Sequence, residues 1–265
     1  MNNNVFDFFQ RYLRSCYLDH QLHLSFDCSS FLNKSKTYQR VYAKNLEINY
    51  VKDNNHQYYL GISPLALGIG LIDHTNYVRS ENRLEVTDIP INFKAFVFND
   101  TYTYQYFFFL PHFLEKKENA EKGLGGNIWY LWNKNLSTGF QTLSGNSQSI
   151  NRNLFGLLFK TGLKQYSYLG EINYTHRKIK SDNSQFGQVT FYNQFSYHPS
   201  DWSMLSYALS GLSKDRDFDS KELRHSFMGQ IKLFKSTTLM YEARLRNIKQ
   251  KNELSHLIQG YFNWW

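Results

Sequence analysis

Apolar and polar residues alternate one by one along most of the chain, and this spacing is typical of strands with one apolar and one polar face. In NLEINY (45–50), for example, every second residue is apolar. The same alternation occurs at 18–28, 101–108, 166–175 and 239–246. Clusters of polar turn residues separate these runs, and short connections alternate with long ones in the second half of the chain. The pattern therefore predicts an antiparallel sheet of about 14 strands.

The length of these strands distinguishes between two kinds of all-β protein. We expect strands of roughly 9–12 residues, longer than the ~5–6 residues usual in globular sheets and similar to the ~9–11 residues of bilayer-crossing strands. The expected fold class is therefore all-β, a single antiparallel transmembrane β-barrel whose strands turn one face to lipid and one to the lumen. A soluble all-β binding protein built as a sandwich is the alternative, and it stays open at this point.

The first residues of the chain follow a different period. Val5, Phe9 and Tyr12 recur at helical spacing, which predicts a short helix. We therefore divide the chain into an N-terminal helical, periplasmic segment at residues 1–16 and a transmembrane barrel at residues 17–265. A packed helix with no special role is the favoured interpretation of the first segment, and a plug, a periplasmic cap or the end of an upstream domain are the alternatives.

Composition is compatible with both kinds of all-β protein. The mean hydropathy of −0.55 alone indicates a soluble chain, but averaging the lipid-facing and lumen-facing positions of a membrane barrel gives a similarly polar value. A membrane-spanning helix needs roughly 20 apolar residues. The longest apolar stretch, 58–72, is too short and is interrupted by Ser63 and Pro64.

Charge narrows the range of partners. The chain has 30 Lys and Arg against 22 Asp and Glu, a formal net charge of +8. Such an excess favours an acidic solute or polymer, or lipopolysaccharide head groups. The basic residues form no compact block and no nucleic-acid motif, so no nucleic-acid partner is expected. We also expect no metal site and no cofactor, because the cysteines and histidines show no metal-ligand spacing. GLGG (123–126) lacks the Lys-Ser/Thr of a phosphate loop and instead predicts a turn.

The chain ends in HLIQGYFNWW, an unusually aromatic terminus. Two ladders of alternate residues run to its end, Leu257, Tyr261 and Trp265 on one face and Ile258, Gly260, Phe262 and Trp264 on the other. This ending and the alternation before it resemble the bacterial outer-membrane β-barrels, whose assembly machinery reads an aromatic last strand. The resemblance covers the chain from about residue 17. It implies a Gram-negative outer-membrane location, contact with outer-membrane lipid and lipopolysaccharide, and insertion by the barrel-assembly machinery.

Aromatic residues near predicted strand ends agree with this resemblance. Trp129, Trp132, Tyr197 and Trp202 would suit the aromatic girdles that lie at the two membrane surfaces of such barrels. In a soluble sandwich the same residues would be ordinary core aromatics.

In a barrel, the polar strand faces line the lumen. The pore-lining residues that we predict are Arg224, Lys232, Glu242, Arg244, Arg246 and Glu171. The excess of positive charge among them predicts a channel or exporter that passes small solutes or a polymer and prefers anions. Mixed charges of this kind also pair with one another and hold a barrel wall together, which is the simpler interpretation.

Two further functions remain open. The barrels of surface-lipoprotein assembly modulators and of polysaccharide exporters are architecturally similar and follow a helical periplasmic domain. An outer-membrane lipid hydrolase is the other alternative, since His23, Ser25 and Asp27 share one face of a predicted strand. A His two residues before a Ser resembles the catalytic strand of outer-membrane phospholipase A and of some lipid A deacylases. The resemblance implies His23 as base, Ser25 as nucleophile and Asp27 as the orienting group, although Phe26 stands where those enzymes have Asn.

Overall fold

The computed structural model describes residues 17–18, 22–32, 39–65, 67–69, 78, 81–82, 90–111, 120–214, 221–234, 237–248 and 251–262. For residues 17–45, 221, 248, 251 and 259–262 it describes the backbone alone. Within these ranges, no helix has the length and apolar character needed to cross a membrane. The helix predicted at residues 1–16 lies outside the described residues, as does the end of the chain at 263–265.

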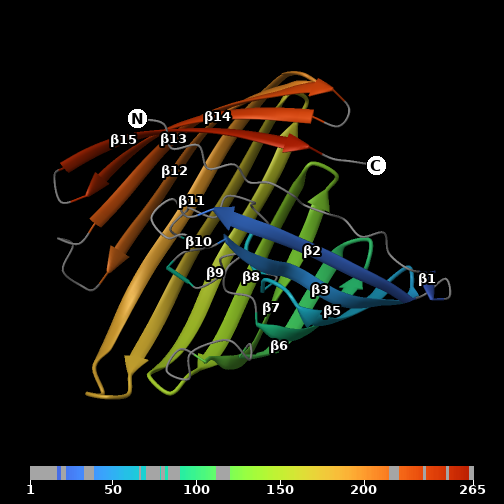
Figure 1. Ribbon diagram of the computed structural model, residues 1–265, viewed down its shortest axis with the longest axis vertical. Helices are drawn as coiled ribbons and strands as arrows, with labels where there is room; N and C mark the ends of the chain where they lie inside the picture. Colours follow the sequence, from blue (N-terminus) through green and yellow to red (C-terminus); the bar gives the residue numbers. More distant parts are fainter. Residues whose placement is uncertain are drawn as a thin grey trace.

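The described residues form one antiparallel sheet in which each strand pairs only with its neighbours along the chain. The strands are β1 (Tyr17–Leu18), β2 (Leu22–Leu32), β3 (Gln39–Asp53), β4 (His56–Ile62), β5 (Ile91–Phe98), β6 (Tyr102–Leu110), β7 (Lys122–Asn133), β8 (Leu136–Asn146), β9 (Ile150–Leu163), β10 (Tyr166–Ile179), β11 (Gln185–Ser200), β12 (Ser203–Lys214), β13 (Lys221–Phe234), β14 (Thr237–Ile248) and β15 (Lys251–Phe262). Figure 1 shows the sheet curled on itself, so that β2 and β3 are seen in front of the long strands β8 and β9 in this view. Among the described strands, no pairing joins β15 to β1 or β2.

The architecture is all-β and antiparallel, as predicted. The predicted count of about 14 strands is not confirmed, because the described residues form 15 strands, the first of only two residues. The strands after β1 run from 7 residues in β4 to 16 in β11, and several therefore exceed the predicted length. A single curled sheet leaves no place for the two packed sheets of a soluble sandwich.

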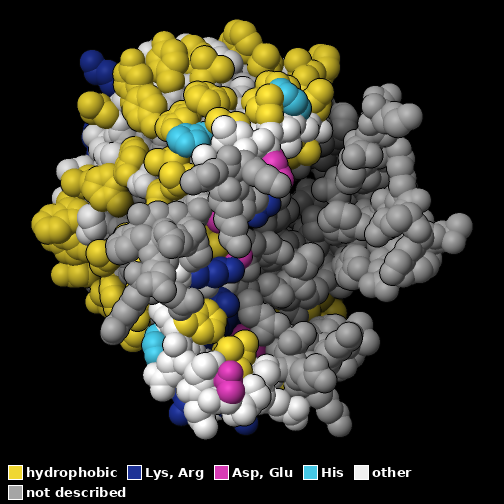
Figure 2. Space-filling model, turned by 90° about the vertical axis from the view of Figure 1, so that its left-hand side faces the viewer, with side chains coloured by type: hydrophobic (Ala, Val, Ile, Leu, Met, Phe, Trp, Pro, Cys, Tyr) yellow, Lys and Arg dark blue, Asp and Glu magenta, His cyan; other side chains and the backbone are white. Residues whose placement is uncertain are grey.

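Exposure along the strands is the reverse of that in a soluble protein. On β10, Ile172 and Tyr174 are both 48% exposed, whereas Asn173 and Thr175 beside them are fully buried. Figure 2 shows hydrophobic side chains over the outer surface, with Lys, Arg, Asp and Glu gathered toward the centre of the view. Water would disfavour such an apolar outer surface, and hydrocarbon would favour it. The alternation in the sequence therefore corresponds to an apolar outer face and a polar inner face.

The outer face contains a ladder of aromatic rings that crosses four strands. The rings of Tyr50, Tyr58, Phe93 and Phe108, on β3 to β6, stack in sequence with centroids 6.2, 6.3 and 5.2 Å apart. Cross-strand aromatic pairs of this kind each contribute roughly 0.2–1 kcal/mol. They fix the register of these strands from the outside, while polar groups fix it from the inside.

The two ends of the sheet differ in their connections. The end that we call the short-turn end has the connections 54–55, 99–101, 134–135, 164–165, 201–202 and 235–236. The opposite end, the loop end, has the connections 33–38, 63–90, 111–121, 147–149, 180–184, 215–220 and 249–250. In outer-membrane barrels the short turns face the periplasm and the longer loops face outward. In the second half of the chain the predicted alternation of short and long connections holds as far as β14, whereas the last loop-end connection, 249–250, is as short as the turns at the other end.

Aromatic residues gather at the short-turn end, but one of the four predicted for a girdle lies elsewhere. Trp132 and Trp202 are exposed there at 60% and 59%, and Tyr197 stacks on Tyr166 at 5.2 Å. Trp129, by contrast, lies on the inner face, where Lys160 Nζ sits 4.3 Å from its ring centroid. The reason is the period of a strand, because positions 129 and 132 are three apart and point to opposite faces.

The predicted turn at 123–126 is also wrong, because these residues lie inside β7. A Cβ at Gly123 would lie 2.8 Å from Phe109 Cζ, and a Cβ at Gly125 would lie 2.8 Å from Phe107 Cζ. Here glycine makes room for two large inward-facing rings and does not mark a break in the strand.

Candidate pore interior and inserted segment

The long connection between β4 and β5 folds into the concave side of the sheet. We call its described residues 63–65, 67–69, 78 and 81–82 the inserted segment. Its apolar side chains enter two clusters on the inner wall. The first cluster joins Leu65 and Leu67 to Phe107, Phe109, Leu143 and Leu154. The second joins Ile69 and Val78 to Leu158, Tyr192 and Ala208. The segment therefore covers inner-face positions on strands β6 to β12.

Backbone groups of the inserted segment bond to polar side chains of the wall. The Gly68 N–H donates to Gln141 Oε1 at 2.6 Å, and the Ile69 N–H donates to Glu171 Oε2 at 3.1 Å. Gln141 Nε2 in turn donates to Glu171 Oε1 at 2.8 Å. Gly68 has a φ of +83° and would bring a Cβ to 2.8 Å from Glu171 Oε2. Only glycine adopts this conformation without strain, and only glycine leaves space for the carboxylate.

Asn82 fixes the far part of the same segment. Its Nδ2 donates to Thr190 Oγ1 at 2.9 Å, and its Oδ1 accepts a hydrogen bond from Thr175 Oγ1 at 2.6 Å. The Asn82 carbonyl accepts a hydrogen bond from the Arg152 guanidinium, whose Nε lies 2.6 Å from Glu121 Oε1. Both Asn82 and Thr175 are fully buried. Because buried polar groups are costly when left unpaired, this network specifies one position for the segment.

The segment is also fixed where it leaves the wall. Lys94 Nζ lies 2.6 Å from Glu47 Oε1, and both side chains are nearly inaccessible. The Ser63 hydroxyl donates to the same carboxylate, and Asn92 Nδ2 donates to the Ser63 carbonyl at 2.7 Å. A buried ion pair adds little net stability, but breaking it leaves an uncompensated charge. This cluster therefore determines the direction in which the chain enters the interior.

The strands β13 and β14 carry most of the predicted pore-lining residues on their inner face. Register places Arg224 directly opposite Arg246, and it places Arg244 opposite Ser226. Arg246 NH2 lies 2.9 Å from Glu222 Oε2. Arg244 binds Glu242 through two hydrogen bonds of 2.5 and 2.6 Å. Two like charges directly opposite one another disfavour pairing of the strands, so the nearby carboxylates are needed to compensate them.

The predicted set thus divides into three environments. Arg224, Arg244 and Arg246 are half-buried on the inner wall, and Glu242 is buried beside them. Lys232 is exposed at the short-turn end of β13. Glu171 is on the inner face, but it is buried against the inserted segment. Sequence reasoning located these strand faces and missed the segment that covers Glu171.

Among the side chains that the structure describes, cations outnumber carboxylates on the inner face of the strands, in the inserted segment and at Glu121, which pairs with the inner-face Arg152. The cations are Lys94, Arg152, Lys160, Arg177, Lys214, Arg224, Lys232, Arg244 and Arg246, and the carboxylates are Glu47, Glu81, Glu121, Glu171, Glu222, Glu242 and Glu253. Several of these cations pair with these carboxylates, as Lys214 does with Glu81 at 3.0 Å, and the pairs leave the surplus of cations unchanged. The inner face therefore carries a net positive charge among the side chains that the structure describes.

The candidate hydrolase residues can be placed only by their backbone. His23, Ser25 and Asp27 lie on β2, where register pairs Ser25 with Glu47 of β3. Glu47 is buried on the inner face. The side chains of the three residues lie outside the described part of the structure, so their predicted roles remain predictions. Within the described residues, no group of three His, Cys, Asp or Glu side chains is arranged to hold a metal ion.

A curled antiparallel sheet with an apolar outside, a charged inside and short turns at one end is the fold of the bacterial outer-membrane β-barrels. An apolar outer face of this kind is favoured by the hydrocarbon of a bilayer.

Several solved barrels share this fold. An OmpT variant lacking loop L8, from Vibrio cholerae, matches with a TM-score of 0.74 and 9% identity, over 94% of this chain and 87% of that one. The anion-selective porin from Comamonas acidovorans matches with a TM-score of 0.63 and 14% identity, over 93% and 83% of the two chains. The outer-membrane channel DcaP of Acinetobacter baumannii matches with a TM-score of 0.65 and 11% identity, over 93% and 82%. No protein-family model and no curated protein matches the sequence.

Proposed function

We propose that the protein is a channel that admits small anionic solutes through the outer membrane and is narrowed by the inserted segment. The observation that carries this proposal is the surplus of inward-facing cations, and in particular Arg224 directly opposite Arg246. These two residues lie on β13 and β14, whereas the two apolar clusters of the inserted segment are centred on β6 to β12. The proposed path therefore has one wall made by the segment and another made by the arginines. The similarity to an anion-selective porin agrees with this proposal.

Reversal potentials across a planar bilayer with a salt gradient test the charge preference. We expect the native protein to prefer anions, because positive charge in a low-dielectric lumen attracts them. Replacing Arg224 with Gln should reduce the anion-to-cation permeability ratio about two- to fivefold, which is up to ~1 kcal/mol at one site. Lys52, exposed beside a short turn, offers a matched control. Lys52→Gln should leave the ratio unchanged, and a native preference for cations would refute the proposal.

A second candidate is the barrel domain of a surface-lipoprotein or polysaccharide export machine. It is favoured by the number of bonds that hold the inserted segment inside, since a channel at rest in such a machine must be closed. The same bilayer recordings distinguish the two functions. Absence of conductance in the native protein, together with conductance after removal of residues 64–89, would support a closed export barrel and contradict the open channel.

A further inference from the structure

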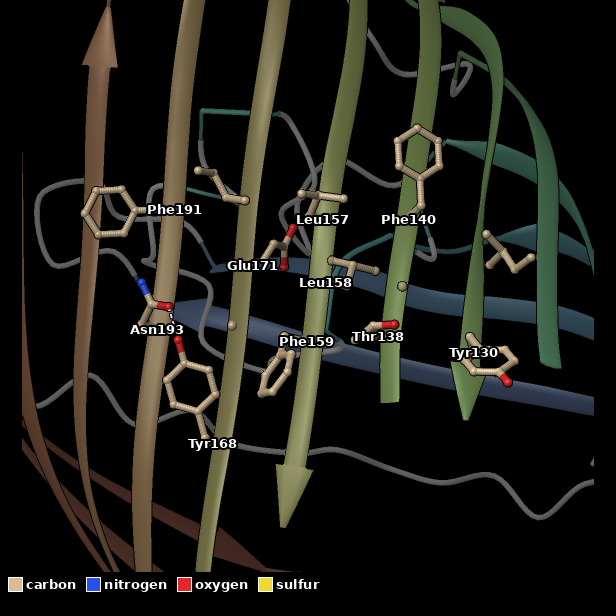
Figure 3. A pocket seen from close by; sticks show the side chains of 14 residues that line it. Tyr130, Thr138, Phe140, Leu157, Leu158, Phe159, Tyr168, Glu171, Phe191 and Asn193 are labelled. Atoms are coloured by element: carbon tan, nitrogen blue, oxygen red, sulfur yellow. Dashed lines mark hydrogen bonds between the residues drawn. The ribbon is translucent and has the colours of Figure 1, made fainter. Parts of the chain in front are cut away.

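The outer wall of strands β7 to β11 contains a groove that the channel proposal does not use. Its volume is about 900 Å³, within the range of roughly 300–1,000 Å³ that is usual for small-molecule sites. Figure 3 shows Tyr130, Phe140, Phe159, Tyr168 and Phe191 projecting around it from successive strands. Most of its lining belongs to the outward-facing set of residues, so the groove opens toward the membrane and not toward the lumen.

Glycine creates the floor of this groove. On the outer face of β10, Gly170 lies between Tyr168 and Ile172, opposite Phe159 on one side and Asn193 on the other. A Cβ at Gly170 would lie 3.1 Å from Tyr168 Cε1 and 3.4 Å from Asn193 Oδ1. The Tyr168 ring therefore leans over the space that a larger residue would fill. Elsewhere on the outer face, side chains such as Leu205 project at 57% exposure.

The lining can accept a hydrocarbon chain. Tyr168 Oη donates to Asn193 Oδ1 at 2.5 Å, so these two polar groups of the lining bond to one another (Figure 3). The surrounding side chains include Ile128, Leu157 and Ile172, all apolar. From Tyr168 to Ile172 the groove follows β10 for four residues, roughly 13 Å. A single acyl chain fits a space of this length and chemistry.

Cationic side chains lie where the groove meets the short-turn end of the sheet. Lys134 occupies the turn between β7 and β8, Lys164 occupies the turn between β9 and β10, and both are exposed. Tyr168 stands four residues after Lys164, and the two turns are separated by two strand spacings, roughly 10 Å. The turns on either side carry Asp100 and Asp201. The two lysines are therefore a local cationic pair directly beneath the groove.

We propose that this groove binds one anionic glycerophospholipid, with an acyl chain in the groove and the phosphate between Lys134 and Lys164. The short-turn end faces the periplasm, so the site lies in the inner leaflet of the outer membrane, which is built of phospholipid. Exposed Trp132 and Leu163 flank the lysines at the level of the head group. Apolar burial and two charge contacts act together, as in other stable lipid attachments. This site is independent of whether the lumen conducts.

Native mass spectrometry of the full chain in mild detergent tests the proposal, with phosphatidylglycerol and phosphatidylcholine of identical acyl chains as the probes. We expect one phosphatidylglycerol to remain bound where phosphatidylcholine dissociates. The double variant Lys134→Gln/Lys164→Gln should bind phosphatidylglycerol roughly 10–30-fold more weakly, since each cation near a membrane surface contributes about a factor of five. Leu157→Trp, which fills the groove from an exposed position, should weaken binding of both lipids.

Matched controls separate this site from general lipid coating. Lys52→Gln removes a cation at the same end of the sheet, and Leu205→Trp enlarges an exposed leucine on β12 outside the groove. Both should bind phosphatidylglycerol like the native chain, and all variants should show the native heat-modifiable gel band. Equal retention of the two lipids, or equal loss in variants and controls, would overturn the proposal. So would a dimer or trimer that Leu157→Trp dissociates, because a second copy would then occupy the groove.

Discussion

Asp182, in the loop between β10 and β11, shows how local hydrogen bonds change the pKa of a carboxyl group. Its carboxylate accepts hydrogen bonds from the Ser184 backbone N–H at 2.9 Å and from the Ser184 hydroxyl at 2.8 Å. These bonds favour the charged form and hold the pKa of Asp182 below its ordinary value of 3.8. Because the folded pKa is lowered, the contribution of Asp182 to loop order is complete above pH 3.8 and is lost as the pH falls through the lower folded value.

Replacing Ser184 with Ala should raise the titration midpoint of Asp182 part of the way toward its ordinary value. The backbone bond, the larger of the two effects on this pKa, would remain. Carboxyl-carbon NMR titration in detergent micelles measures the midpoint. Ser200→Ala removes a hydroxyl from the end of β11, which bonds to Ser203 at the start of β12, and should leave Asp182 unchanged. An unchanged midpoint in Ser184→Ala would show that the side-chain bond has no effect in solution.

At the scale of elements, the strands were predictable and the inserted segment was not. The outward and inward sets of β3, β6, β10 and β14 follow the sequence alternation, because a strand admits only two faces. The segment has no such constraint. Its Leu65, Leu67 and Ile69 were visible only as an apolar stretch too short to span a membrane. Apolar residues in a long connection between two-faced strands were the available signal, since an exposed loop has no reason to carry them.

The segment's conformation depends on Gly68, and Gly68→Ala tests that dependence. Alanine at a φ of +83° is strained by roughly 1–2 kcal/mol, and its Cβ would also displace the Glu171 carboxylate. We expect the segment to loosen, which would raise single-channel conductance and current noise in bilayer recordings. Gly229→Ala is the matched control, since its Cβ would meet nothing closer than Leu205 Cδ2 at 3.8 Å. Identical recordings from the two variants would mean that the segment does not limit the current.

At the scale of the whole molecule, apolar side chains cover the exposed outer surface and polar side chains are buried inside. Sequence alternation predicted two unlike faces, and strand length together with the aromatic terminus favoured the apolar face as the outer one. The groove on that face escaped prediction, because its floor depends on which residues of five strands come side by side. Such neighbours follow from register, which a single sequence does not reveal.

Because the exposed apolar face lies against lipid, an arginine placed on it should lower the free energy of unfolding more than most surface substitutions do. Phe227 of β13 is 59% exposed, and in water Phe227→Arg would change stability by only about 0.5 kcal/mol or less. In a bilayer we expect a loss of roughly 2–4 kcal/mol near the midplane. Urea titration of folding into lipid vesicles measures this difference. Gln230→Arg, on the inner face of the same strand, should cost less than about 1 kcal/mol, and equal effects of the two changes would contradict a membrane-facing exterior.

A strictly sequential order of strands also has a consequence for how the molecule can vary in size. Since β1 to β15 pair only with their chain neighbours, removing two consecutive strands and their turn leaves the order and direction of the other strands unchanged. The flanking strands then meet directly, still antiparallel, and the circumference falls by two strand spacings, roughly 10 Å. In this architecture the number of strands, and with it the width of the molecule, changes by one hairpin at a time. A duplication or loss inside one gene can thus widen or narrow the passage while leaving every remaining bond between strands as it was.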